Sequence, residues 1–475
     1  MKENAPREVV AVNANELSTT LNTFQCGLVS YLGDLGLPTK NILVDTRERS
    51  KVIVNLPEVL SVLPKGVLGE SLYISKFVAA CGAGLFDAAL NFVWDETVSN
   101  LRQKAAKFDL EYFYNSVVTD QDRRHKFTTE EDLKNLDDWE LVRGCHLTGI
   151  LSALGFRHLD YIRNMRNWAS AAHPNQNQIT GLQLVSWLET CIREVIARDP
   201  STPAITIQRL LNNIRTHALV PTDIQLIAEN IALLPDDLVT SLLRTIFGMF
   251  CDSGAAVSVK DNIRLIAPAT WNRASDQSRR EVGVKYANYA ANADVVRRDS
   301  AKNFLQIVDG LTFLPKDTLT VEINEAIQAL QLAHMGFNNF YNEPPHAKAL
   351  AKFIPASGTV PEAVRYIYVK TVSMCYIGNG YGVSGSAYPY YEELVSKFQD
   401  KEIYSLVRLL ADEDFASRLQ FQSCQERFRA LLSKLKGKTA NDVVLQAISY
   451  LLKQNEKQLP GCGNVTEYKR RVGLA

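Results

Sequence analysis

The chain has 475 residues, of which 46% are hydrophobic and 22% charged, so it is long enough for about two to four domains with sizeable cores. Lys and Arg total 52 and Asp and Glu also total 52, which gives zero net charge and excludes a protein coated with positive charge for binding duplexes, so that any RNA contact must be local. The sequence has no run of about 18 apolar residues and no apolar signal core at its start, and we expect a cytoplasmic protein that makes no membrane contact. Its eight cysteines include no Cys-x-x-Cys pair, which indicates core residues in a reducing compartment and neither disulfides nor zinc ligands.

Residues 1–74 are predicted to form an N-terminal segment that packs on the domain after it. Apolar residues on one side of 16–32 indicate a helix. The apolar triplets 42–44 and 52–54, separated by a polar stretch, predict a short β-hairpin.

Residues 75–200 are predicted to form a helical bundle. Apolar spacings of three and four residues indicate helices over 75–100, 103–114, 137–154 and 157–173. Thr180 and Gln183 have the spacing of a capping box, which opens one more amphipathic helix. The stretch 197–203, with two prolines, marks the end of this domain.

Residues 201–475 are predicted to form a helical C-terminal domain. Successive helices of about ten to twenty residues are separated by Pro, Gly and Asp. Similar turns around Pro235 and Pro315 indicate stacked helical pairs in the manner of an α-solenoid, although no fixed period is visible. The predicted fold class is therefore all-α, a helical bundle followed by a solenoid-like region.

The stretch 161–175 contains the residues that we consider first for catalysis. Arg166, Asn167 and His173 lie on one predicted helix, and Pro174 ends it. Seven residues at about 100° each bring His173 back to within about 20° of Arg166. An arginine for a phosphate and a histidine for proton transfer suffice to cut RNA without a metal.

This wording, Arg166-Asn167 followed by Ala172-His173-Pro174, resembles the active-site motif of HEPN-domain ribonucleases. The resemblance covers about residues 75–200 and is sharp only over 163–175. It implies a HEPN-like bundle that acts as a metal-independent endoribonuclease without cofactors, often in antiviral defence or as a toxin. It further implies that His173 handles protons, Arg166 neutralises charge on the phosphate and Asn167 orients the ribose or the arginine. The partners it implies are an RNA substrate, a second copy of the chain in a homodimer, and a regulatory protein or antitoxin.

Two other interpretations remain open. In the first, Arg166 and His173 are ordinary residues of a non-catalytic helical scaffold that binds a protein or RNA partner. In the second, the Gly-x-Gly-x-x-Gly letters at 380–385 bind a nucleotide, but no βαβ pattern surrounds them. Tyrosines near that loop are candidate stacking faces for unpaired bases, and with an arginine of the motif helix they complete the candidate RNA contacts: Arg163, Tyr381, Tyr388 and Tyr390.

Overall fold

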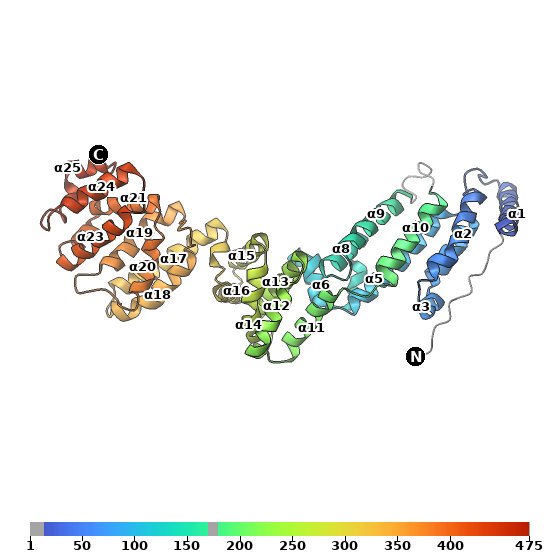
Figure 1. Cartoon of the computed structure of the whole chain (residues 1–475), viewed down its shortest axis with the longest axis horizontal. Helices are drawn as coiled ribbons and strands as arrows, with labels where there is room; N and C mark the ends of the chain where they lie inside the picture. The colour runs from blue at the N-terminus through green and yellow to red at the C-terminus, as the bar shows by residue number, and fades with distance from the viewer. Residues whose placement is uncertain (1–13, 170–178, 475) are drawn as a thin grey trace. The chain divides into compact units, whose positions relative to one another are not determined.

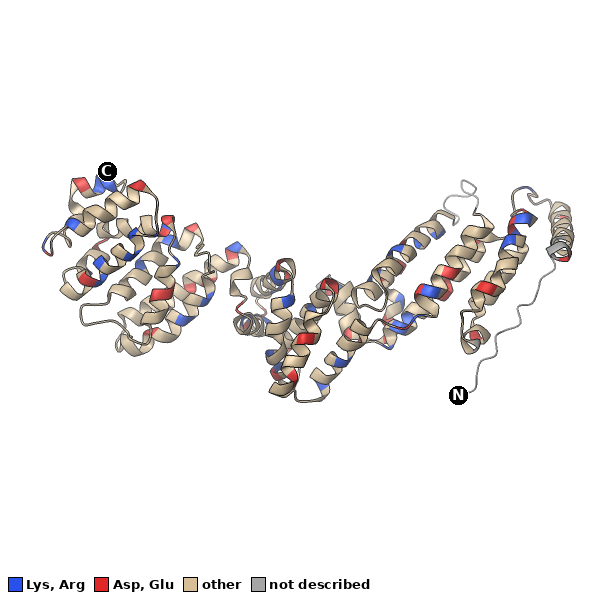
Figure 2. Cartoon of the chain, viewed as in Figure 1, with Lys and Arg blue, Asp and Glu red and all other residues tan. Residues whose placement is uncertain are grey.

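The chain is all-α, as predicted (Figure 1). The computed structural model describes residues 14–169 and 179–474, and within these two ranges it contains no β-strand. Across the same residues no helix combines the length and the apolar character needed to cross a bilayer. Lys and Arg are interspersed with Asp and Glu over the helices, in keeping with the zero net charge (Figure 2).

The chain divides into two compact units. Unit 1 extends to residue 275 except for 251–253, and unit 2 comprises 251–253 and residues from 276 onward. The domain edge expected near residue 200 therefore falls inside unit 1.

Several helices of unit 1 have a polar side chain that caps their first turn. Asp109, Asp137 and Thr180 each accept a hydrogen bond from a backbone N–H in the first turn of the helix that follows. The predicted capping box of Thr180 and Gln183 is confirmed. The helices of this unit are α1 (Ala14–Asp34), α2 (Thr46–Leu60), α3 (Lys65–Glu70), α4 (Leu72–Ala83), α5 (Phe86–Ala106), α6 (Leu110–Val117), α7 (Gln121–Arg124), η1 (Glu130–Asn135), α8 (Asp138–Leu147), α9 (Ala153–Ala169), α10 (Gly181–Cys191), η2 (Ile192–Ile196), α11 (Thr202–Thr216), α12 (Pro221–Ala232), α13 (Asp236–Cys251) and α14 (Val257–Arg273).

Helix α5 lies at the centre of the predicted bundle region. It contacts α4, α8, α9 and α10, and its residues Leu90, Val93 and Trp94 are fully buried. Helix α2 packs against both α4 and α10, so the N-terminal helices lie against the bundle (Figure 1).

The predicted β-hairpin of 42–44 and 52–54 is wrong. Residues 52–54 lie within α2, which begins after Asp45, whose side chain accepts a hydrogen bond from the backbone N–H of Arg47. Val52, Leu56 and Val59 are buried at four- and three-residue spacing, as on one face of a helix. Packing of that face overrides the β-preference of the valines.

Several predicted helix boundaries also move. The helix expected over 75–100 is divided between α4 and α5 at Gly84, which adopts a left-handed conformation with φ of 88°. The helix expected over 103–114 is likewise divided between α5 and α6. The expected end of the motif helix at residue 173 lies outside the described residues, and α9 is described to Ala169.

The helices of unit 2 pack around one buried helix, α19 (Glu362–Ile377). All residues of α19 from Tyr368 to Ile377 are buried, and the helix contacts α17, α20, α21 and α23. The helices of this unit are α15 (Asp276–Ala291), α16 (Val295–Ile307), η3 (Leu311–Phe313), α17 (Lys316–Met335), α18 (Asn339–Phe353), α19 (Glu362–Ile377), α20 (Tyr388–Ser396), α21 (Asp400–Arg408), η4 (Leu409–Ala411), α22 (Glu413–Arg418), α23 (Gln422–Lys436), α24 (Asp442–Lys453), η5 (Cys462–Asn464) and α25 (Thr466–Arg471).

Candidate active site

Helix α9 carries the described part of the candidate site, and its inner face holds it against the bundle. Gly155, Leu159 and Ile162 are buried at spacings of four and three residues, and the helix contacts α5, α8 and α10. Arg166 lies in the last turn, four residues after Ile162, and so continues this buried row. Its side chain is therefore directed along the edge of the interface, where α5 and α8 can reach it.

Arg166 is held by side chains from three helices. Its Nε donates to Oδ1 of Asn91 on α5 at 3.1 Å, and its Nη1 donates to Oδ1 of Asn167 at 3.0 Å. Nη1 also lies 3.3 Å from a carboxylate oxygen of Asp138 on α8. With 26% of its side chain exposed, Arg166 is oriented by the fold and still reaches solvent.

Two acidic residues, Asp138 and Asp95, interact with this guanidinium. Asp138 accepts a second hydrogen bond, at 2.7 Å, from the indole N–H of the buried Trp94. Asp95, one residue further along α5, has a raised pKa because burial disfavours its charged form; nearby Asp138 raises that pKa further, while Arg166 lowers it. The site thus combines a fixed cation with a carboxyl group whose proton is retained to higher pH than usual.

Next to Asp95 lies a cavity of about 410 Å³. Its wall contains Arg102 and Lys134 together with Glu130 and Glu131, so charges of both signs face the space. The Nε atom of Arg102 is buried and has no hydrogen-bond partner among the described residues. Asp95 thus connects this cavity with the residues around Arg166.

The other predicted residues of the motif helix differ in their surroundings. Asn167 is exposed and bonds to Arg166, so these two candidate residues are brought together. Arg163 donates to Asp160 at 2.8 Å and to Asn164 at 3.2 Å, within its own helix. Its predicted contact with RNA stays a prediction.

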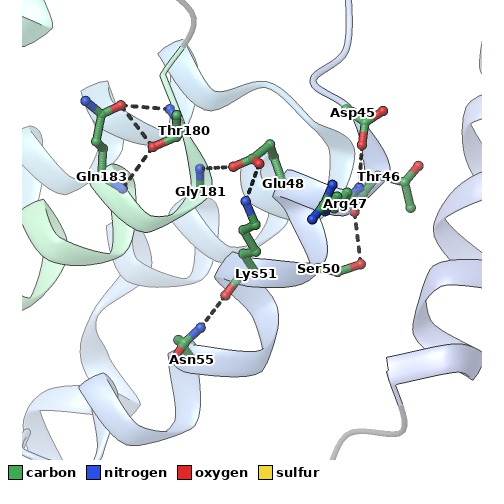
Figure 3. A network of polar contacts seen from close by, with 10 residues as sticks. All are labelled: Asp45, Thr46, Arg47, Glu48, Ser50, Lys51, Asn55, Thr180, Gly181 and Gln183. Atoms are coloured by element: carbon green, nitrogen blue, oxygen red, sulfur yellow. Dashed lines mark hydrogen bonds and ion pairs between the residues drawn. The ribbon is translucent and has the colours of Figure 1, made fainter.

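His173 lies outside the described residues, but the chain is described on both sides of that segment. After it, Thr180 caps α10, and the backbone N–H of Gly181 donates to Oε2 of Glu48 on α2 at 2.8 Å (Figure 3). Glu48 also pairs with Lys51, and these two interactions, led by the one with Lys51, lower the pKa of Glu48. A Cβ atom at Gly181 would lie 2.3 Å from the carbonyl oxygen of Glu48, so only glycine allows α2 and α10 to approach this closely.

The predicted tyrosines belong to unit 2. Tyr381 is 91% exposed, in the loop between α19 and α20, and its neighbours Gly380 and Gly382 have positive φ. This loop follows a helix, whereas a dinucleotide-binding loop follows a strand. Tyr388 and Tyr390 lie in the first turn of α20 and are half-buried, and the ring of Tyr388 lies 5.2 Å from that of Tyr376.

The sequence did not predict Asn91, Trp94, Asp95 or Asp138 as parts of the site. They lie on α5 and α8, between 28 and 75 residues from Arg166, and no local spacing connects them with it. Their grouping arises only when α5, α8 and α9 pack side by side (Figure 1).

Comparisons of the chain with protein-family models, with curated proteins and with solved structures found no match. The function is therefore inferred from the chemistry of the residues around Arg166.

Proposed function

We propose that the protein is a metal-independent endoribonuclease of the HEPN type, with Arg166, Asn167 and His173 as its catalytic residues. The observation that carries the proposal is the fixed and solvent-accessible guanidinium of Arg166. A cation held in place before the substrate arrives stabilises developing negative charge without the cost of reorganisation. The proposal includes the HEPN-like bundle over 75–200 and a role in antiviral defence or as a toxin.

The proposed reaction uses the ribose 2′-hydroxyl as the nucleophile. His173 takes the proton from this hydroxyl or gives one to the leaving 5′-oxygen, and Arg166 neutralises the charge on the phosphate between them. Asn91, Asn167 and Asp138 engage Nε and Nη1 of Arg166. A guanidinium also carries two N–H donors on Nη2, and the proposal assigns these to a phosphate oxygen.

A homodimer is part of the proposal, and the exposed face of α9 supports it. Leu154, Tyr161 and Trp168 are each more than half exposed and follow one another at seven-residue spacing, so they lie on one side of the helix. Single exposed apolar residues are common, but a row along one helix face is typical of a helix that packs against another. A second copy on this face would place two α9 helices side by side about one two-fold axis, with each Arg166 on the side of its helix that faces its own bundle.

The main alternative is a helical scaffold that binds a partner without cutting it. The observation that favours this alternative is a set of exposed aromatic side chains in unit 2, namely Phe337, Tyr341 and Tyr381. Exposed rings suit the stacking of unpaired bases or the binding of a protein. The solenoid-like organisation expected for 201–475 stays a prediction, and the contact of α19 with α23 extends beyond the neighbouring pairs of a simple repeat.

Incubation of the full chain with end-labelled single-stranded RNA in EDTA tests the proposal. We expect cleavage by the wild type, loss of cleavage in Arg166→Ala and His173→Ala, and no loss in the matched variants Arg157→Ala and His158→Ala. Arg157 and His158 are exposed residues of the same helix α9. Wild-type protein that binds RNA and leaves it intact would favour the scaffold, and equal cleavage by all variants would remove Arg166 and His173 from the mechanism.

A further inference from the structure

Unit 2 buries a group of polar side chains where four of its helices meet. His334 is near the end of α17, Glu343 is in α18, Cys375 is in α19 and Tyr391 is in α20. Each of the four is at most 5% exposed. Polar groups this deep in a core require partners, because burial without a hydrogen bond costs free energy.

Glu343 is the centre of the group. Its Oε1 lies 2.9 Å from Nδ1 of His334 and accepts a hydrogen bond at 2.7 Å from the side-chain amide of Asn339. Its Oε2 accepts a hydrogen bond at 2.7 Å from the Tyr391 hydroxyl. Side chains from α17, α18 and α20 thus orient a single carboxylate.

The group is incompletely satisfied by these contacts. Nε2 of His334 is buried and has no hydrogen-bond partner among the described residues. An unpaired buried polar atom costs about 1–3 kcal/mol. Nε2 of His334 is therefore free to bind a ligand that is not part of the described chain.

The donor atoms of His334, Glu343 and Cys375 lie within 4.8 Å of one another. In a tetrahedral site with metal–ligand bonds of about 2.0–2.3 Å, ligand atoms are about 3.3–3.8 Å apart. Movements of about 1 Å in the side chains would therefore close the three donors around one ion. Among the described residues, no other group of three His, Cys, Asp or Glu side chains brings its donor atoms within this distance of one another.

We propose that His334, Glu343 and Cys375 bind one Zn²⁺ ion inside unit 2. A nitrogen, an oxygen and a sulfur donor suit zinc, which is borderline in softness, whereas calcium and magnesium take oxygen ligands. On binding, the Cys375 thiol loses its proton to solution and its sulfur becomes a thiolate ligand, while neutral His334 keeps its proton on Nδ1 towards Glu343 and donates the lone pair of Nε2 to the ion. The charges of the thiolate and the Glu343 carboxylate then balance the two positive charges of the ion, so the buried site is neutral.

Asn339 and Tyr391 are positioning residues in this site. Each bonds to Glu343 and fixes the direction in which its carboxylate oxygens point. These two residues lie next to two connections between helices. Asn339 begins α18 directly after the α17–α18 turn, and Tyr391 lies in α20 shortly after the α19–α20 loop. The Ser384 hydroxyl already joins these two connections by a hydrogen bond to the Phe340 carbonyl.

Zinc would thus fix the two connections that carry the exposed rings of Phe337 and Tyr381. Its role is to stabilise this end of unit 2. The inference is independent of the proposed ribonuclease activity, because the residues of the Arg166 network all belong to unit 1.

The test is a titration of the metal-free full chain with Zn²⁺, and with Co²⁺ as a coloured substitute. We expect one ion per chain by elemental analysis, a sulfur-to-cobalt charge-transfer band, and a higher Tm of the zinc form because the ion binds only the folded state. Asn339→Ala should weaken binding about 10–100-fold, and loss of a direct ligand in Cys375→Ser should weaken it more and abolish the band.

Cys424→Ser is the matched control, since Cys424 is also a fully buried cysteine of unit 2 and is no part of the cluster. It should bind zinc as the wild type does. The proposal is overturned if folded wild-type protein takes up no zinc and shows no shift in Tm, or if Cys375→Ser retains the charge-transfer band. The wild-type measurements decide the matter even if a variant fails to fold.

Discussion

Replacement of Arg166 by alanine separates a catalytic role of this residue from a structural one. The substitution removes hydrogen bonds of 3.1 and 3.0 Å to Asn91 and Asn167 and an ion pair of 3.3 Å with Asp138. Each hydrogen bond contributes about 1 kcal/mol net, and an ion pair that is partly exposed contributes about 0–1 kcal/mol. The free energy of unfolding should therefore fall by about 2–3 kcal/mol, which for a unit of this size is a Tm decrease of roughly 4–10 °C.

Activity should fall much further than this stability loss explains. Removal of one group that stabilises transition-state charge typically costs about 10²–10³ in rate. The assay measures initial rates of RNA cleavage well below the Tm of each variant, with far-UV circular dichroism to verify that the protein is folded. Under these conditions a folded Arg166→Ala variant should be nearly inactive.

Asp138→Asn is the matched control for this experiment. It removes the same ion pair, while the amide oxygen can still accept the hydrogen bond from Trp94, now 2.7 Å long. We expect a stability loss of about 1 kcal/mol or less and a rate within about tenfold of the wild type. Equal losses of activity in Asp138→Asn and Arg166→Ala would refute the reasoning, because activity would then depend on the ion pair and not on the positive charge of Arg166.

Three further predictions concern the same unit. Tyr161→Asp should convert the proposed dimer to a folded monomer in analytical ultracentrifugation, because the charge would be placed in the exposed row of α9; a monomeric wild type that cleaves RNA at low concentration would contradict this. Cleavage should leave a 2′,3′-cyclic phosphate, fail on 2′-O-methyl RNA and on DNA, and have a bell-shaped pH dependence, as read by mass spectrometry and rate measurements; a 5′-phosphate product would exclude His173 acting through the 2′-hydroxyl. Two carboxyl groups should have opposite effects on Tm at pH 7. Asp95→Asn should raise the Tm, because the raised pKa of Asp95 in the folded protein costs stability once the pH exceeds the pKa of the unfolded chain. Glu48→Gln should lower the Tm, because the lowered pKa of Glu48 in the folded protein adds stability at pH 7, and this is lost only as the pH falls through that folded-state pKa. Both differences should disappear once the pH lies below the folded and unfolded pKa values of the two groups, and differences of the same sign at pH 7 would show that the causes assigned to these shifts are wrong.

The all-α class and most helices could be predicted from the sequence because their causes are local. An amphipathic row and a cap, such as Thr180 with Gln183, lie within a few residues of each other. The hairpin prediction failed at Val52 to Val54 for the opposite reason: three β-branched residues favour a strand locally, and only the burial of Val52 with Leu56 and Val59 decides for a helix. The break at Gly84 was visible as a glycine, but its left-handed conformation depends on the turn into α5.

The two candidate sites differ in how much of each the sequence could predict. Arg166 and Asn167 follow one another in the chain, so a motif is enough to select them, whereas Asn91 and Asp138 reach Arg166 only through packing. The buried cluster has no local signal at all. His334, Glu343 and Cys375 are separated by 9 and 32 residues, without the short spacing that usually marks zinc ligands, and the sequence therefore indicated core cysteines and no metal.

The described residues on either side of 170–178 are held by contacts with other helices. Ala169 is the last described residue of α9, and its helix is anchored by Arg166 to α5 and α8. On the far side of residues 170–178, α10 begins at Gly181, whose backbone N–H is fixed by Glu48 of α2. The described segments before and after residues 170–178 are thus each held by a side chain from another helix, as Figure 3 shows for Gly181 and Glu48. The packing of α2, α5 and α10 therefore helps to set the positions of Ala169 and Gly181, so the N-terminal helices contribute to the positions of the described residues on either side of 170–178.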